Sequence, residues 1–581
     1  MNALSIIRDS GLLAPQCPNA FVGGPQLQDV CSASSGLVFL TVLNSLLVSS
    51  PKIGDPCGRV EPIKRPALEY DFIVVGGTFA NPCLSPCGEM DWQYLTSNES
   101  QACLSQGGRC YWPRGKNLGG CTAHHGMAYH RGHAKDYERW VEKGNTGWSW
   151  EEVLPVFKKM EDNTEIDRVG SKYHGTGGPM TVQRFPWHPP FADCVMRAAE
   201  ETGLGVIEDL VGDKNKGFTV AQTISRNGVR LSTVASHIRP NRHRKNLHVA
   251  VNATVTKVRT IGKKATGIEM IMNGKRHVVR ARREVILSAG TINSPQLLLL
   301  SGIGPKKHLS EVKIPVVHHL PGVGENLHNH QSYGIDFSLN EKLFSELNTD
   351  SATQYLNNQT GPLSGTGMAQ VTGILASKHT TPDDPDVQIF FAGYQAICTP
   401  KIKVADLGTF GERMPVRMTS VNVQPVSKGV IKLNTNNPLE PPYIWSNDLG
   451  EKLDRLRVVA GIRIIQNLTS ASLWKGLGLR NEHVRQPECS HLKADSDEYW
   501  ECAITYVTRP ENHQAGTCQM GPASNPMAVV DPRLKVHGMK GLRVADASVM
   551  PRVVSGNPVA AINMIGQRAA DFIKEDWGIS A

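Results

Sequence analysis

The chain has 581 residues, of which 40% are apolar and 20% charged. This length and composition predict a globular protein with more than one domain and exclude a disordered or fibrous chain. The formal charge is +9, but the densest basic run, residues 239–245, is short and has no aromatic side chains within it. Nucleic acid is therefore not an expected partner.

The N-terminal part reads as a leader and linker. Residues 36–49 form an apolar run of about 14, which matches a signal-peptide core and is too short for a stable membrane span. The alternative is an apolar leader that packs on the body of the protein. Four Asn-x-Ser/Thr sequons and 13 cysteines favour a secreted glycoprotein with disulfides. Cys103 and Cys110 bracket a short loop and are the predicted bridge. No cysteine spacing fits a zinc site, so no metal is expected.

Three short apolar runs predict buried parallel strands. They are Tyr70–Val75 before Gly76 and Gly77, Glu284–Ala289 before Gly290, and Leu542–Ala545 before Asp546. A helix is expected to begin at Ser294-Pro295 and another at Asn557-Pro558, with Asn557 as its N-cap. The last helix should bury one apolar face, formed by Ile562, Ile565, Ala569 and Ile573.

Strands this far apart in the chain have to assemble into one layered α/β domain. We expect a leader and linker over residues 1–66. The first domain would take residues 67–135, 226–324 and 511–581. Residues 136–225 and 325–510 would form a second domain that covers the first and shapes a substrate pocket.

Two polar residues near the C-terminus suit the oxidation of an alcohol. Such a reaction needs a base for the hydroxyl proton while a hydride leaves the carbon, and imidazole titrates near neutrality. A second polar group should hold the developing alkoxide, which an Asn amide does without titrating. His513 and Asn557 are the candidates for these two roles.

The surrounding residues resemble the glucose–methanol–choline oxidoreductase family. The C-terminal likeness lies in residues 513–521, 541–548 and 555–558, and two further signatures lie in residues 112–120 and 289–304. The resemblance implies an FAD-binding, Rossmann-like first domain and an α+β second domain with an antiparallel sheet. It implies that His513 is the base, that Asn557 assists it, and that a hydride passes from the CH–OH carbon to flavin N5.

The same resemblance assigns residues to the flavin. The glycines would let the backbone approach the cofactor, and Val255 corresponds to the position whose backbone reads the adenine. The expected cofactor-binding residues are Gly76, Gly77, Trp112, Arg114, Gly119, Gly120, His124, His125, Met127, Val255, Gly290, Asp546, Ala547, Asn557 and Pro558. Residues 21–25, 54–59 and 495–500 are similar to the insect-type glucose dehydrogenases, which implies a sugar or other alcohol as substrate and a quinone-type electron acceptor.

The first nucleotide-binding turn departs from the family pattern. A dinucleotide fold opens with a strand, G-x-G-x-x-G, a helix and a second strand that ends in an acidic residue. Here only Gly76 holds one of the three glycine positions, and Pro82 and Pro86 exclude the helix. The first helix, the second strand and the ribose-binding acid are therefore expected to be missing. The alternative function is a cofactor-deficient homologue without redox activity, from a splice form, a gene-model error or a pseudoenzyme.

The residues after the first glycine signature also depart from the pattern. His125 stands where most relatives carry Asn, and His124 falls where choline oxidases carry the histidine that is covalently bound to FAD. A covalent flavin at His124 is one hypothesis; the other is that both histidines line the pocket.

Overall fold

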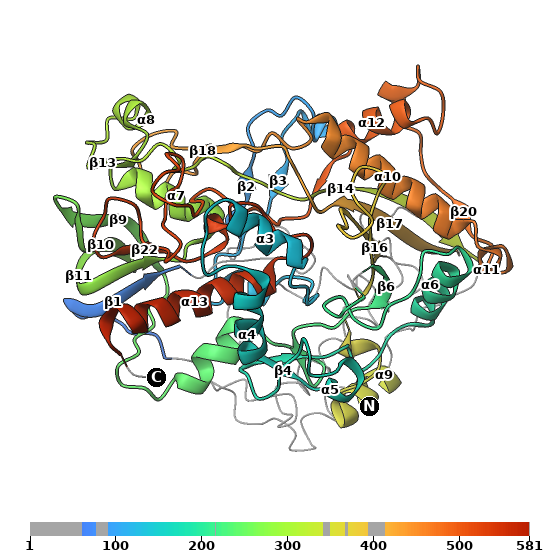
Figure 1. Cartoon of the computed structure of the whole chain (residues 1–581), viewed down its shortest axis with the longest axis horizontal. Coiled ribbons are helices and arrows are strands. Elements are labelled where there is room, and N and C mark those ends of the chain that lie inside the picture. Colours follow the sequence, from blue (N-terminus) through green and yellow to red (C-terminus); the bar gives the residue numbers. More distant parts are fainter. Residues whose placement is uncertain are drawn as a thin grey trace, which may run out of the picture.

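The computed structural model describes residues 61–76, 91–214, 216–340, 349–365, 370–392 and 413–579. Most of the predicted leader and linker therefore lies outside the described residues. Two β-sheets lie toward opposite ends of the long axis of the molecule (Figure 1). Within the described ranges, no helix combines the length and the apolar character needed to cross a bilayer.

The first sheet is assembled from segments that are distant in the chain, as predicted. Its order is β1-β11-β10-β9, and β22 pairs with β11. The strands are β1 (Glu69–Val75), β9 (Ala253–Ile261), β10 (Lys264–Met272), β11 (Lys275–Leu287) and β22 (Leu542–Val544). β1 and β22 run parallel to β11. β10 is antiparallel to β11, and β9 is antiparallel to β10. β11 starts nine residues before the predicted strand because its first half completes the β9–β10 meander.

The helix after β11 begins earlier than its proline predicted. α7 spans Gly290–Leu300 and contains Pro295. Pro295 has no N–H for the carbonyl of Thr291, four residues before it. The hydroxyl of Thr517 donates to that carbonyl instead, at 2.6 Å. A residue from the C-terminal segment thus satisfies the acceptor that the proline leaves free, so the helix can include it.

The C-terminal helix packs along the first sheet (Figure 1). α13 spans Val559–Trp577 and buries Ile565 and Ala569, while Ile562 and Ile573 are half-buried. The predicted N-cap was wrong. Pro558 occupies that position without a side-chain cap, because the Asn557 side chain bonds elsewhere, to Gln388 and His513.

The second sheet is antiparallel, as the family resemblance implied. Its order is β20-β14-β17-β16-β15-β6, with β21 also paired to β14. The strands are β6 (Gly217–Val220), β14 (Gln331–Leu339), β15 (Val371–Leu375), β16 (Val387–Ala392), β17 (Met414–Asn422), β20 (Arg480–Asn481) and β21 (Arg509–Pro510). Helices α10 (Lys452–Thr469) and α12 (Asp497–Tyr506) pack with this sheet in one core (Figure 1). The exact domain boundaries stay a prediction.

Further short elements connect the sheets. The helices are α3 (Ala134–Glu142), α4 (Trp150–Met160), α5 (Ile166–Val169), α6 (Pro190–Glu201), α8 (Lys306–Glu311), α9 (Thr349–Asn358) and α11 (Ser472–Gly476). Paired strands are β2 (Tyr94–Leu95) with β3 (Tyr111–Trp112), β4 (Glu161–Asn163) with β5 (Met180–Val182), β7 (Ser225–Arg226) with β8 (Val229–Arg230), β12 (Ile303–Gly304) with β13 (His318–His319), and β18 (Val430–Lys432) with β19 (Tyr443–Trp445).

The free edge of β1 is exposed. Among the described residues, β1 pairs only with β11. Val74 is 65% exposed and Leu68, just before the strand, 76%. Strand side chains point to the faces of a sheet, and the faces of a parallel sheet are normally covered, so these values mark apolar surface of β1 that is left uncovered. Gly77 and the two prolines of the shortened turn lie outside the described residues.

Candidate functional site

His513 and Asn557 are brought together from segments 44 residues apart. The Nδ2 atom of Asn557 lies 3.4 Å from Nε2 of His513. The His513 backbone N–H donates to Oδ1 of Asn329 at 2.9 Å, which fixes the loop before β14 against the His513 segment. The predicted base and its predicted partner therefore share one site.

Burial keeps the imidazole of His513 neutral. Desolvation, together with the nearby charge of Arg114, lowers the pKa of His513 to about 3. A neutral imidazole has one nitrogen with a free lone pair, which is the form that accepts a proton from an alcohol. The site thus supplies a base without prior deprotonation at neutral pH.

A second histidine, which the sequence did not single out, contacts the first. Nδ1 of His330 lies 2.9 Å from Nδ1 of His513, and the two rings meet edge to face. Burial holds the pKa of His330 well below its usual range. Its Nε2 has no hydrogen-bond partner in the described part of the chain. Two histidines two residues apart, His328 and His330, just before a strand are the signal that could have drawn attention to it.

Asn557 is held on its other side by Gln388. Nε2 of Gln388 lies 3.2 Å from Oδ1 of Asn557 and 3.2 Å from Oγ1 of Thr372. Gln388 is fully buried on β16, in an otherwise apolar run. A buried amide in such a run requires hydrogen-bond partners, and this was a sequence signal for its role.

The first glycine signature places further predicted residues beside His513. Arg114 is buried and donates from Nη2 to the carbonyl of Asn512, at 2.9 Å. Burial lowers the pKa of His125 to about 3, and the charge of Arg230 contributes to this shift. His125 Nδ1 accepts from the backbone of Met127 at 2.7 Å. His124 instead contacts Asn117 through Nε2.

Several buried polar atoms of this segment have no partner in the described structure. They are Nε1 of Trp112, Oδ1 of Asn117 and Nε2 of His125. Buried polar groups are nearly always hydrogen-bonded. Gly119 and Gly120 follow in left-handed backbone conformations, φ 90° and 61°. The segment therefore has the polar atoms and the backbone to hold a buried polar ligand.

Asp546 joins the two turns at the carboxyl ends of β11 and β22. Its Oδ2 accepts from the Gly290 N–H at 2.9 Å and from the Ser294 hydroxyl at 2.5 Å, and its Oδ1 accepts from the Ser548 N–H at 2.8 Å. Burial raises its pKa, and these hydrogen bonds oppose the rise. Asp546 thus clamps the turn, and Ala547 accepts from the Gly516 N–H at 3.2 Å. Contacts of these residues with a flavin stay a prediction.

The remaining predicted cofactor residues lie at the first sheet or at α13. Gly76 ends β1 at φ 142°, and a Cβ there would lie 1.9 Å from the carbonyl oxygen of Ser288. Only glycine allows this contact between the β1 and β11 ends. Val255 lies on β9, paired with Met270, and Pro558 stands at the start of α13.

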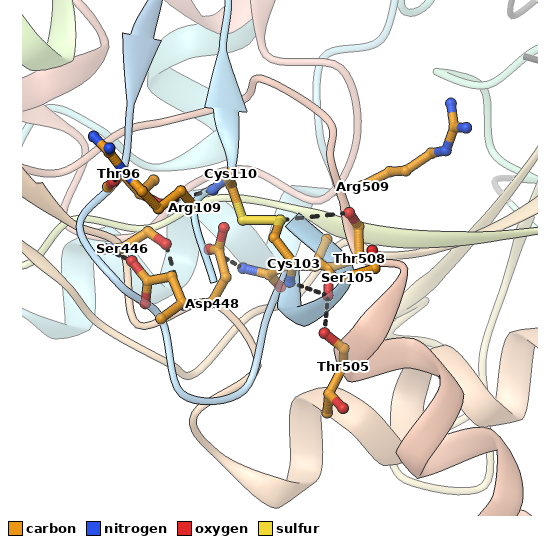
Figure 2. Close-up of a disulfide and its surroundings, with 12 residues drawn as sticks. Thr96, Cys103, Ser105, Arg109, Cys110, Ser446, Asp448, Thr505, Thr508 and Arg509 are labelled. Atoms are coloured by element: carbon orange, nitrogen blue, oxygen red, sulfur yellow. Dashed lines mark hydrogen bonds between the residues drawn. A yellow bond between two sulfur atoms is a disulfide. The ribbon is translucent and has the colours of Figure 1, made fainter. Parts of the chain in front are cut away.

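The predicted disulfide anchors the segment that leads to His513. Cys103 and Cys110 are bonded, with Cα atoms 5.5 Å apart (Figure 2). The Cys103 N–H lies 3.3 Å from Oγ1 of Thr508, and Ser105 donates to the Tyr506 carbonyl at 2.6 Å. The loop therefore fixes the end of α12 and the strand that precedes the site. A second disulfide, Cys489–Cys502, joins α12 to the turn before it.

Comparisons with known proteins identify the family. The N-terminal model of the GMC oxidoreductases matches residues 70–332, and the C-terminal model matches residues 425–566. Glucose dehydrogenase [FAD, quinone] of Drosophila pseudoobscura pseudoobscura is 40% identical, over 97% of both chains. Mitochondrial choline dehydrogenase of Homo sapiens is 34% identical, over 80% of this chain and 76% of its own length. The Drosophila alignment spans 608 positions, more than the 581 residues here, so part of that relative has no counterpart in this chain.

Solved structures share the fold. A formate oxidase superposes with a TM-score of 0.75 at 22% identity, over 87% of this chain and 98% of its own. Pyridoxine 4-oxidase from Mesorbium loti superposes with a TM-score of 0.72 at 22% identity, over 86% of this chain and 93% of its own. At this identity the likeness concerns the fold alone.

Proposed function

Because the chain belongs to the GMC oxidoreductase family, we propose that it is an FAD-dependent dehydrogenase that oxidises the CH–OH group of a sugar or another alcohol. The observation that carries the proposal is the half-buried His513–Asn557 pair. The relatives named for FAD, glucose and quinone support the cofactor, a glucose-like substrate and a quinone-type acceptor.

The residues near His513 fit the ring end of a flavin. Unpartnered buried atoms of Asn117 and His125 offer hydrogen bonds, and Gly119 and Gly120 let the backbone approach a ligand. Bound FAD would supply the hydride acceptor. The shortened turn after Gly76 offers fewer groups to the nucleotide end.

The chain's own residues move the proton. The alcohol hydroxyl donates to the lone pair of His513 Nε2, while Asn557 Nδ2 donates to the alcohol oxygen as it acquires negative charge. The proton then rests on Nε2 of His513.

The first experiment is to purify the full chain with and without added FAD and record its visible spectrum. Flavin bands together with glucose-dependent reduction of a quinone dye support the proposal. A protein that stays colourless in excess FAD overturns it and favours the cofactor-deficient alternative. His513→Ala should lower turnover by about 100-fold to 10,000-fold with folding kept, and His513→Gln is the matched variant of similar size. Acid precipitation tests the covalent link, since a colourless pellet excludes a bond at His124.

We further propose that the protein is a secreted glycoprotein. All four sequon asparagines, at positions 98, 252, 358 and 467, are exposed, and the two described disulfides suit an oxidising compartment. Expression in insect cells should place the protein in the medium and give a mass that falls on treatment with N-glycosidase. Retention in the cell without glycan would contradict this.

A further inference from the structure

A row of buried hydrogen bonds connects the second sheet to Asn557. It begins at the backbone carbonyl of Ile389, to which the Thr372 hydroxyl donates at 3.1 Å. Thr372 on β15 and Gln388 on β16 are diagonal neighbours across the two strands, since Thr372 pairs with Phe390, and both are fully buried. The row continues from Gln388 to Asn557 at 3.2 Å. A backbone carbonyl only accepts, so the row has a defined direction.

The direction can be followed atom by atom. The Thr372 hydroxyl has one proton, which goes to Ile389, so its oxygen accepts from Gln388. The Gln388 amide therefore turns its NH₂ group to Thr372 and to Oδ1 of Asn557. The Asn557 amide in turn directs Nδ2 toward His513.

The direction of these hydrogen bonds also determines which ring nitrogens of His513 and His330 carry a proton. An N–H from Asn557 can approach only a nitrogen with a lone pair, so Nε2 of His513 carries no proton. The one proton of the neutral ring is then on Nδ1, which donates to Nδ1 of His330 at 2.9 Å. His330 then carries its own proton on Nε2, which has no partner among the described residues.

We propose that Thr372, Gln388 and His330 are positioning residues, which hold neutral His513 with its proton on Nδ1 and with Nε2 as the nitrogen that can accept the proton of the alcohol. The proposal rests on the proposed function, since it assigns a purpose to the tautomer of the base. It also assigns the second sheet a role beyond shaping a substrate pocket, because two of its strands set the protonation pattern of the site.

The direct test is a neutron structure of the deuterated full-length protein. We expect deuterium on Nδ1 and none on Nε2 of His513, and the NH₂ group of Gln388 directed at Asn557. Deuterium on Nε2, or on both nitrogens of His513, would overturn the proposal. This measurement does not depend on turnover or on bound cofactor, so it stands even if His513→Ala leaves activity intact and the proposed function fails.

A substitution of equal size reverses the direction of the row. Gln388→Glu replaces the donor by a carboxylate that only accepts, so Asn557 should turn its NH₂ group away from His513 and present Oδ1 to it. His513 should then carry its proton on Nε2, and kcat/KM should fall by at least about 100-fold, as expected for a base in the wrong tautomer. Gln388→Met, which has no hydrogen bonds, is the control and should lose less.

The pH profile separates positioning from packing. Below the pKa of the introduced carboxyl, a proton restores a donor toward Asn557, so kcat/KM of Gln388→Glu should rise on acidification while that of Gln388→Met does not. At position 330, Gln keeps an acceptor for His513 and should retain most activity, whereas Leu should lose about tenfold or more. Melting temperatures check folding. A Gln388→Glu enzyme with wild-type kcat/KM, or equal losses for Gln and Leu at 330, would refute the proposal.

Discussion

Acid should destabilise the fold because several histidines are buried in their neutral form. Among the histidines whose pKa is lowered mainly by burial, five have the largest shifts, namely His125, His130, His328, His330 and His513. In the unfolded chain each titrates near 6.5. A group whose pKa falls on folding stabilises the fold above its unfolded pKa, and this contribution is lost as the pH falls.

The size of the effect follows from proton linkage. Between pH 6.5 and about 5.5, each of the five histidines lowers the free energy of unfolding by about 1 kcal/mol. Buried carboxyls act in the opposite sense, and the largest resolved values are those of Glu99, whose pKa burial raises to about 7, and Asp448, whose pKa burial raises to about 6. Protonation of Glu99 and Asp448 in the folded state raises the free energy of unfolding by about 2 kcal/mol. Together, these histidines and carboxyls lower the free energy of unfolding by about 3 kcal/mol over this pH interval.

Urea denaturation followed by tryptophan fluorescence at about pH 7.5, 6.5 and 5.5 measures this loss. The midpoint should fall steeply between the last two values. His328→Asn removes one buried imidazole, so its stability should fall by about 1 kcal/mol less over the same interval. A midpoint that is constant or higher at the lowest pH would show that these histidines are not held neutral.

Three further substitutions test the ion pair, the disulfide and the site. Glu161→Leu leaves the charge of fully buried Arg131 without its partner and should cost about 3–5 kcal/mol in urea denaturation; a loss below about 1 kcal/mol would contradict this. Replacing Cys103 and Cys110 together by Ser should cost about 2–3 kcal/mol through the released loop, and unchanged stability under oxidising conditions would refute it. Asn557→Leu should lower kcat by about 100-fold to 1,000-fold at an unchanged melting temperature, and wild-type kcat would exclude the alkoxide contact.

The strands and the base were predictable because local patterns define them. Apolar runs that end at Gly76, Gly290 and Asp546 gave the three parallel strands of the first sheet. His513 stood in a polar loop next to a motif of the family. The N-terminal half of β11 was missed because its alternating pattern, with exposed Lys275 and Arg276, differs from a buried parallel strand.

What the sequence could not give were contacts that depend on tertiary packing. The start of α7 depends on Thr517 across the domain, and the start of α13 depends on where the Asn557 side chain finds partners. Gln388 lies on β16 of the second sheet, and His330 lies just before β14 of the same sheet. Both are far from His513 in the chain, so no local spacing relates them to it. Their role appears only once β14 and β16 are in place.

The shortened turn should affect the nucleotide-binding end of the site and the end around His513 differently. The groups around His513 come from β16, from the segment before β14 and from the C-terminal loops, none of which includes the free edge of β1. Among the described residues, β1 pairs only with β11, and its other edge is where a nucleotide-binding strand would pair. Loss of that strand should thus weaken FAD affinity and leave the proton-transfer groups in position. Turnover measured as a function of added FAD should show a raised cofactor concentration at half-saturation with a kcat close to that of the Drosophila relative. A low kcat at saturating FAD would mean that the shortened edge also distorts the site.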